Sequence, residues 1–209
     1  MVDGLPASAV NTLVSTLVTE VERLKVKGSG VAPIADTPFK IYYFPVKGRA
    51  FAQLVMLEGA GINYEWNKIP KNTWKDVKPR TYFGHTPFAE HGPVRIAQSM
   101  AITHYIARLG GIEGETPADY AMSEMLICQG NEIFEFLFDA AHPPADATEK
   151  QKADLWETCM TEQVPGHLKP LEPMMISEDK FTSTLTAGEL LLFANLHSSV
   201  DLEPKLLEP

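Results

Sequence analysis

Two short segments of the chain carry residue types that can bind and activate a small anionic ligand. Tyr42 and Tyr43 are adjacent in an aromatic, β-branched run, and a phenol there can donate a hydrogen bond to an anion. Neighbouring strand residues point to opposite faces, so only one of the two can serve a given site. Ser99 begins a helical pattern, where its hydroxyl, its N–H and the helix dipole suit a carboxylate, although a plain N-cap would use the same serine.

The spacing of the histidines, serines, glycines and cysteines argues against several other kinds of site. The six histidines have no metal-binding spacing and no accompanying carboxylate cluster, so we expect no metal site. The chain contains no Ser/His/Asp arrangement and no glycine-rich phosphate loop. Its two cysteines, Cys128 and Cys159, form neither a disulfide framework nor a CxxC pair, which fits a reducing compartment.

The composition is that of a soluble globular protein of one or two domains, with 209 residues, 44% of them hydrophobic. The net charge of −9 argues against nucleic acid as the main partner. No apolar run reaches the length of a membrane span, and the first 30 residues lack the pattern of a secretory signal. We therefore expect a cytoplasmic protein, or an organellar one if a targeting segment has been removed.

Charge divides the chain into two parts. Residues 40–111 carry ten Lys or Arg and four Asp or Glu, whereas residues 112–209 carry five and nineteen. Two interpretations remain open: surfaces of opposite sign that pack together, or a basic first domain that attracts a small anionic ligand.

The elements that must position these residues follow from periodicity and turn signals. Residues 40–111 predict a small α/β layout of order β-α-β-β-β-α, with strands at 40–44, 64–69, 88–90 and 94–96 and helices at 50–59 and 98–108. Residues 112–209 predict helices alone, at 118–138, at 147–168 with Leu155, Trp156, Cys159 and Val164 facing inward, and from a capping box at Thr186–Glu189. Residues 10–24 predict one amphipathic helix in an N-terminal extension.

Four motifs resemble the cytosolic glutathione S-transferases. The run KIYYFPVKGRA at 40–50 is similar to the first strand and loop of the tyrosine-type classes, sigma above all. GHTPFAE at 84–90 is similar to the stretch around the family's cis-proline, and IAQSMAITHYIA at 96–107 to its glutamate-binding helix start. The capping box at Thr186 matches the start of a buried helix in the family's second domain. The resemblance covers residues 40 to about 207 and says nothing of residues 1–39.

The resemblance implies a thioredoxin-like α/β N-terminal domain followed by an all-α C-terminal domain. We expect domains at 38–112 and 116–209, preceded by an extension at 1–37. Because the chain ends about twenty residues after the capping box, the C-terminal domain is shortened relative to such relatives.

The resemblance also implies roles for individual residues. Tyr43 would stabilise the glutathione thiolate, with positive field from Arg49. Thr86, before a cis bond to Pro87, would pair with the cysteinyl backbone of glutathione. The remaining contacts would come from Gln98 and Ser99 at the γ-glutamyl carboxylate, from Trp74 and Lys78 at the glycine end, and from Met122 and Met125 on the apolar side.

These roles imply an enzyme that transfers glutathione, its co-substrate, to a small apolar electrophile, and that forms a homodimer. A sigma-like variant would instead isomerise a prostaglandin-type peroxide. The alternative is a catalytically silent subunit of a larger complex, which the short C-terminus and the added N-terminal helix favour. A thiol-disulfide oxidoreductase is disfavoured, because the loop after the first strand contains tyrosine and no cysteine.

Overall fold

The computed structural model describes residues 37–177 and 180–202. The expected extension and its helix at 10–24 lie outside the described residues. Within the described part of the chain, no helix is both long and apolar enough to cross a membrane.

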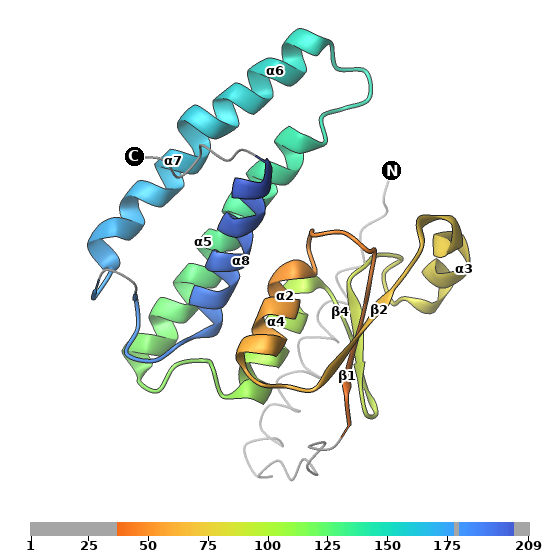
Figure 1. Cartoon of the computed structure of the whole chain (residues 1–209), viewed down its shortest axis with the longest axis vertical. Helices are drawn as coiled ribbons and strands as arrows, with labels where there is room; N and C mark the ends of the chain where they lie inside the picture. Colours follow the sequence, from red (N-terminus) through yellow and green to blue (C-terminus); the bar gives the residue numbers. More distant parts are fainter. Residues whose placement is uncertain (1–36, 178–179, 203–209) are drawn as a thin grey trace, which may run out of the picture. The chain divides into compact units, whose positions relative to one another are not determined.

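A four-stranded mixed sheet forms the first part of the fold (Figure 1). Its spatial order is β2-β1-β3-β4, in which β1 is parallel to β2 and antiparallel to β3. The strands are β1 Phe39–Tyr43, β2 Tyr64–Lys68, β3 Phe88–His91 and β4 Val94–Ala97. The sequence placed each strand end within one residue of these bounds.

The pleat of β1 separates its two tyrosines. Phe39, Ile41 and Tyr43 are buried against the helices, as strict alternation requires. Tyr42 lies on the opposite face, where its ring stacks on Phe88 and its hydroxyl donates to Glu90 Oε2 at 2.9 Å.

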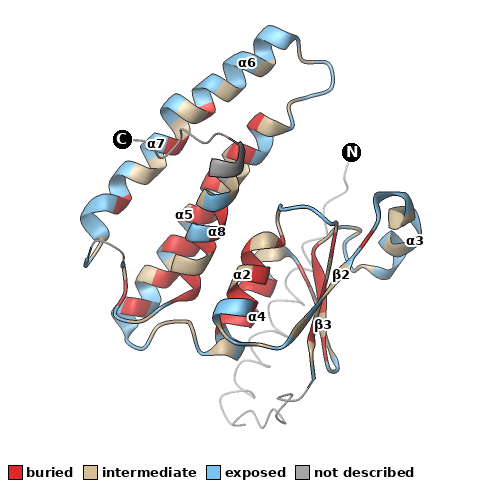
Figure 2. Ribbon diagram, viewed as in Figure 1, coloured by how far each residue is buried: buried red, intermediate tan, exposed pale blue. Residues whose placement is uncertain are grey.

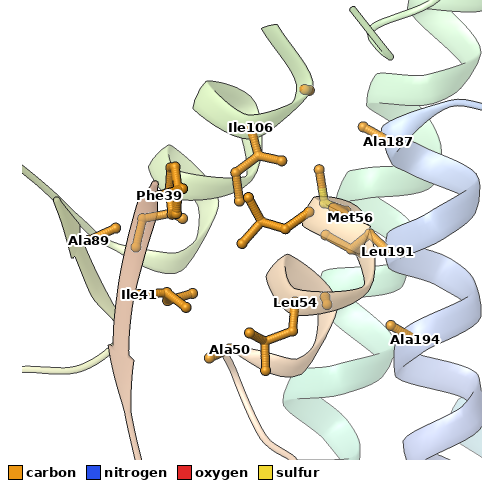
Figure 3. Close-up of a cluster of buried hydrophobic side chains, with 14 of the residues drawn as sticks. Phe39, Ile41, Ala50, Leu54, Met56, Ala89, Ile106, Ala187, Leu191 and Ala194 are labelled. Atoms are coloured by element: carbon orange, nitrogen blue, oxygen red, sulfur yellow. The ribbon is translucent and has the colours of Figure 1, made fainter. Parts of the chain in front are cut away.

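Two helices, α2 Phe51–Gly59 and α4 Ser99–Gly110, share one apolar core with β1. Figure 3 shows that Leu191 and Ala194 of α8 (Ala187–Leu202) reach the same core beside Met56 of α2. The last helix is therefore part of the support of the first domain, although it begins more than a hundred residues after the end of α2.

A short helical segment lies between β2 and β3. It consists of the 3₁₀ turn η1 Lys71–Thr73, the helix α3 Trp74–Val77 and the 3₁₀ turn η2 Lys78–Arg80. The Lys78 N–H donates to the Trp74 carbonyl, so these two residues lie one helical turn apart, as their spacing predicted. The Trp74 ring packs edge-on against Phe44, 5.6 Å away.

The second part of the fold is helical. Its elements are α5 Pro117–Ala141, α6 Glu149–Thr158, the π-helical η3 Cys159–Gln163, α7 Val164–Leu168, the 3₁₀ segment η4 Lys169–Met174, and α8. Together with the sheet and its helices, this confirms the expected thioredoxin-like α/β plus all-helical fold class.

The helix expected at 147–168 is present over 149–168, with a π-helical turn inside it. This wider turn, η3, ends two residues before Pro165, which has no N–H to donate to the preceding turn. Cys159 and Val164 are buried as expected, but Leu155 is exposed. Figure 2 shows that α6 is mostly exposed, and none of its residues is buried.

The crossing of α5 and α8 depends on a glycine. A β-carbon at Gly188 would collide with the carbonyl oxygen of Ser123, and the Gly188 N–H donates to Ser123 Oγ at 3.1 Å. Just before it, the Thr186 N–H donates to Glu189 Oε2 at 3.1 Å. The helix start predicted at Thr186–Glu189 is confirmed, and it is held against α5.

Candidate glutathione site

Tyr43 ends β1 with its side chain 7% exposed, and its hydroxyl faces the loop that follows. The hydroxyl oxygen accepts the N–H of Arg49 at 3.1 Å. A β-carbon at Gly48 would lie 2.7 Å from that oxygen, so the close approach of the loop requires glycine there.

The environment of Tyr43 keeps its phenol protonated. Burial raises the pKa of Tyr43, and the Arg49 N–H and the Arg49 charge offset only part of this effect. At neutral pH the group is therefore a hydrogen-bond donor. Among the described residues no acceptor takes its hydrogen, which leaves it available for a ligand anion.

A polar cavity of about 160 Å³ lies near the start of α4. It is lined by Arg49, Phe83, His85, Thr86, Pro87, Ala97, Gln98 and Ser99. Five of these were singled out in the sequence: Arg49, Thr86, Pro87, Gln98 and Ser99. They come from three segments, and the sheet and α4 bring them together.

Thr86 presents main-chain groups at this cavity. The Thr86–Pro87 peptide bond is cis, as the resemblance implied. Within residues 37–177 and 180–202, neither the N–H nor the C=O of Thr86 has a hydrogen-bond partner. Both groups are therefore able to pair with an extended peptide, in the manner of an added strand.

The start of α4 has an unusual backbone. Gln98 has φ 77° and ψ 120°, a conformation that is costly for a residue with a β-carbon. Gln98, not Ser99, occupies the N-cap position, and Ser99 is the first helical residue. No partner within the described part of the chain takes the Ser99 hydroxyl, so the plain N-cap interpretation of Ser99 does not describe this helix.

Arg49 is paired with a residue that the sequence analysis missed. Its two terminal nitrogens donate to Glu135 on α5 at 2.6 and 2.7 Å, and its guanidinium lies 5.3 Å from the ring centres of Phe134 and Phe138. The hydrogen bonds to Glu135 raise the pKa of Arg49, against the opposing effect of burial. The guanidinium charge is thus shared with a carboxylate. Arg49 and Glu135 are 86 residues apart in the sequence, so no local sequence pattern predicts this pair.

An apolar cavity of about 220 Å³ adjoins Tyr43. It is lined by Tyr43, Val46, Lys47, Gly48, Phe134, Leu137, Phe138, Ala141, His142, Asn195 and Ser198. The α5 residues in this lining recur at helical spacing, a signal that was present in the sequence. Met122 and Met125 do not line it: Met122 packs in the core between α5 and α8, and Met125 is half exposed.

Trp74 and Lys78 line neither cavity. The exposed Lys78 side chain instead packs beside Gly84, two residues before Thr86. Their assignment to the glycine end of glutathione stays a prediction. No group of three His, Cys, Asp or Glu side chains among the described residues is arranged to hold a metal ion.

A thioredoxin-like domain with a buried phenol at the end of its first strand, a polar cavity at a helix start and an all-helical second part defines the glutathione transferase class of protein. The family model "Glutathione S-transferase, N-terminal domain" matches residues 37–108. The class-mu 28 kDa glutathione S-transferase of Schistosoma bovis is 30% identical over 176 residues, which cover 80% of this chain and 82% of the relative. The chain belongs to the glutathione S-transferase family.

Two further relatives agree with this assignment. The hematopoietic prostaglandin D synthase of Gallus gallus is 33% identical over 137 residues, which cover 66% of each chain. The solved sigma-class enzyme of Fasciola hepatica superposes with a TM-score of 0.72 at 26% identity, covering 82% of this chain and 84% of that one.

Proposed function

We propose that this protein transfers the thiolate of glutathione to a small apolar electrophile, and that it is a tyrosine-type, sigma-like enzyme. The observation that carries the proposal is Tyr43: a buried phenol whose oxygen is held by the Arg49 N–H and whose hydrogen is available. The likeness to the Fasciola hepatica sigma-class structure supports the same class.

The polar cavity would bind glutathione. The Ser99 hydroxyl and the N–H groups at the start of α4 would donate to the γ-glutamyl carboxylate, which the positive end of the helix dipole favours. The main-chain N–H and C=O of Thr86 would pair with the cysteinyl backbone. Gln98 would hold the same end of the ligand as Ser99, while Trp74 and Lys78 would contact the glycine end.

The reaction needs a thiolate, because the neutral thiol is a weak nucleophile. The Tyr43 O–H would donate to the sulfur, which favours loss of the thiol proton to water. The thiolate then attacks the electrophilic carbon in the apolar cavity and a C–S bond forms. Either a leaving group departs with its electron pair, or an activated alkene takes a proton from water.

Comparison of Tyr43→Phe with Tyr42→Phe tests the proposal. We expect Tyr43→Phe to lower turnover near neutral pH by roughly ten- to a thousandfold, as for the loss of one positioned donor. The pKa of the bound thiol should rise, which displaces the pH–rate profile to higher pH, and the affinity for glutathione should change much less. The assay measures conjugation of a neutral aryl halide, together with glutathione binding by calorimetry.

Tyr42→Phe is the matched control, because its hydroxyl lies on the other face of the sheet and donates to Glu90. It should be nearly silent. Equal losses in the two variants, or full activity in Tyr43→Phe, would remove Tyr43 from the reaction. Glutathione binding without turnover in the wild type would favour the silent subunit, which no observation on the described residues supports.

A second candidate activity rests on the 33% identity to a prostaglandin D synthase. We propose isomerisation of a prostaglandin-type peroxide, with glutathione bound in the same site and returned unchanged. Incubation of such a peroxide with glutathione and the enzyme should yield the isomer, and the yield should fall in Tyr43→Phe. Decay at the rate of the enzyme-free control would exclude this activity.

We propose further a cytoplasmic homodimer with an extension at 1–37, a glutathione-binding domain at 38–112 and a helical domain at 116–209. The family model, which matches residues 37–108, supports the first boundary. Light scattering on the full chain would test the dimer.

A further inference from the structure

A buried amide lies directly behind the start of α4. Gln53, in the first turn of α2, is 2% exposed and sits among apolar residues of the shared core. An amide in such surroundings is costly unless it is hydrogen-bonded, so its partners show what it does for the fold.

Both hydrogen bonds of the Gln53 nitrogen go to the start of α4. Nε2 donates to Thr103 Oγ1 at 2.8 Å and to the carbonyl oxygen of Ser99 at 3.2 Å. Gln53 therefore ties α2 to the first turn of the helix whose N-terminus lines the polar cavity. Gln53 does not line the polar cavity, so its hydrogen bonds hold the start of α4 from behind the site.

The Gln53 side chain also borders a small polar space. Gln53 Oε1 is buried, and among the described residues it has no hydrogen-bond partner. A space of about 10 Å³ lies beside Gln53, with Arg49, Ser99, Asn131 and Asn195 among its lining residues. That is about the volume of one water molecule on the same measure, and the lining is polar enough to hold one.

We propose that Gln53 is a positioning residue for glutathione binding: with a buried water on Oε1, it fixes the first turn of α4 so that Ser99 meets the carboxylate without rearrangement. This inference rests on the proposed function. A helix start that is already fixed loses less conformational freedom on binding, and small displacements of binding groups weaken binding steeply.

The test compares Gln53→Met with two other variants. Gln53→Met fills the same space and removes the ties to α4. Because a net hydrogen bond is worth about two- to tenfold in an equilibrium constant, we expect the Kd and KM for glutathione to rise by about three- to tenfold. The value of kcat at saturating glutathione should stay within about twofold. Thr103→Val, which leaves the tie to the Ser99 carbonyl, should raise KM less.

Gln129→Met is the matched control, since Gln129 is a half-buried amide bound to His167, away from both cavities. It should lower stability and leave KM unchanged. Equal KM values in Gln53→Met and the wild type, or equal rises in Gln53→Met and Gln129→Met, would overturn the proposal. If Gln53→Met does not fold, Gln53→Asn, whose amide is one methylene shorter, gives the same comparison.

Two measurements separate this proposal from the proposed function. Absence of glutathione binding in the wild type would defeat the function itself. Amide hydrogen exchange over residues 99–103, measured without ligand, should be faster in Gln53→Met than in the wild type, and equal rates would show that Gln53 does not fix this turn. A high-resolution crystal structure should show a water within hydrogen-bond distance of Gln53 Oε1, and its absence there would remove the water from the proposal.

Discussion

Tyr42 and Tyr43 are chemically identical neighbours, but their hydroxyl groups have different hydrogen-bond partners in the fold. Burial is the largest cause of the raised pKa at both phenols, but the Tyr42 hydrogen is already donated to Glu90. The Tyr43 oxygen instead accepts from the Arg49 N–H, which leaves its hydrogen for another acceptor. A donor at this site therefore depends on which face of the pleat a residue occupies as well as on its type.

The Ser99 hydroxyl is the second residue-scale feature that can be tested. Since it has no partner among the described residues and is not the N-cap, Ser99→Ala should fold as the wild type does. A charge-assisted hydrogen bond contributes about 1.5–3 kcal/mol, so glutathione should bind roughly tenfold or more weakly to the variant. Calorimetry of glutathione binding measures this.

Thr73→Ala is a suitable control for Ser99→Ala, because its hydroxyl donates to the Pro70 carbonyl in an exposed turn. It should bind glutathione as the wild type does. Unchanged affinity in Ser99→Ala would remove Ser99 from the binding site.

At the scale of the elements, carboxylates in the first turns of α5 and α8 hold the helical part together. At the start of α5, Asp119 accepts the Ser183 N–H at 3.0 Å and the Ser183 and Thr116 hydroxyls at 2.8 Å each. At the start of α8, Glu189 accepts the N–H groups of Phe181 and Thr186. Both carboxylates thus bind the loop before α8, and the Asp119 contacts join that loop to α5.

The Asp119 contacts predict a pH dependence of stability. The Ser183 N–H, followed by the Thr116 and Ser183 hydroxyls, lowers the pKa of Asp119 from its ordinary value of 3.8. A carboxyl whose pKa is lower in the folded state contributes stability above its unfolded pKa, and this contribution is lost as the pH falls through the folded value. We expect Asp119→Asn to be less stable than the wild type at pH 7, and the difference to begin to shrink below about pH 4 and to narrow further as the pH falls toward the lower folded pKa.

Denaturant unfolding of the two proteins at pH 7 and at pH 3 measures this effect. Asp154→Asn, on the exposed α6, controls for the change in net charge. A difference between wild type and Asp119→Asn that is as large at pH 3 as at pH 7 would show that the ionised carboxylate is not its source.

At the scale of the whole molecule, an ion pair joins the basic and acidic parts of the chain. Arg49 pairs with Glu135, which links residues 40–111 to α5. This contact agrees with the first of the two interpretations of the charge division. The second, a basic domain that attracts an anionic ligand, stays a prediction.

The Arg49–Glu135 pair can be measured by a double-mutant cycle. Its side chains are 30% and 39% exposed, so solvent screens the pair, but its bidentate geometry is favourable. We expect a coupling free energy near the upper end of the 0.2–1 kcal/mol found for exposed pairs, from denaturation of Arg49→Met, Glu135→Met and the double variant.

Glu157→Gln, on the exposed side of α6, is the control for removing one negative charge, and it should leave the free energy of unfolding nearly unchanged. A coupling free energy of zero between Arg49 and Glu135 would mean that the pair does not stabilise the contact between the first loop and α5.

The sequence by itself determined the features that depend on local chemistry. Runs of β-branched and aromatic residues and a hairpin turn identified the strands, turn residues and caps placed the helix starts at Ser99 and Thr186, and four motifs in order identified the family. It also placed Thr86, Pro87, Gln98 and Ser99 at segment ends that the structure brings into one cavity. These inferences succeed because side-chain periodicity and capping act over only a few residues.

Only the tertiary structure decided which distant residues complete the site. Glu135 holds Arg49, Phe134 and Leu137 line the apolar cavity in place of Met122 and Met125, and Gln53 ties α2 to α4. Such contacts cross long sequence separations, and their partners are chosen by the packing of α5 and α8 against the first domain, which no local pattern encodes.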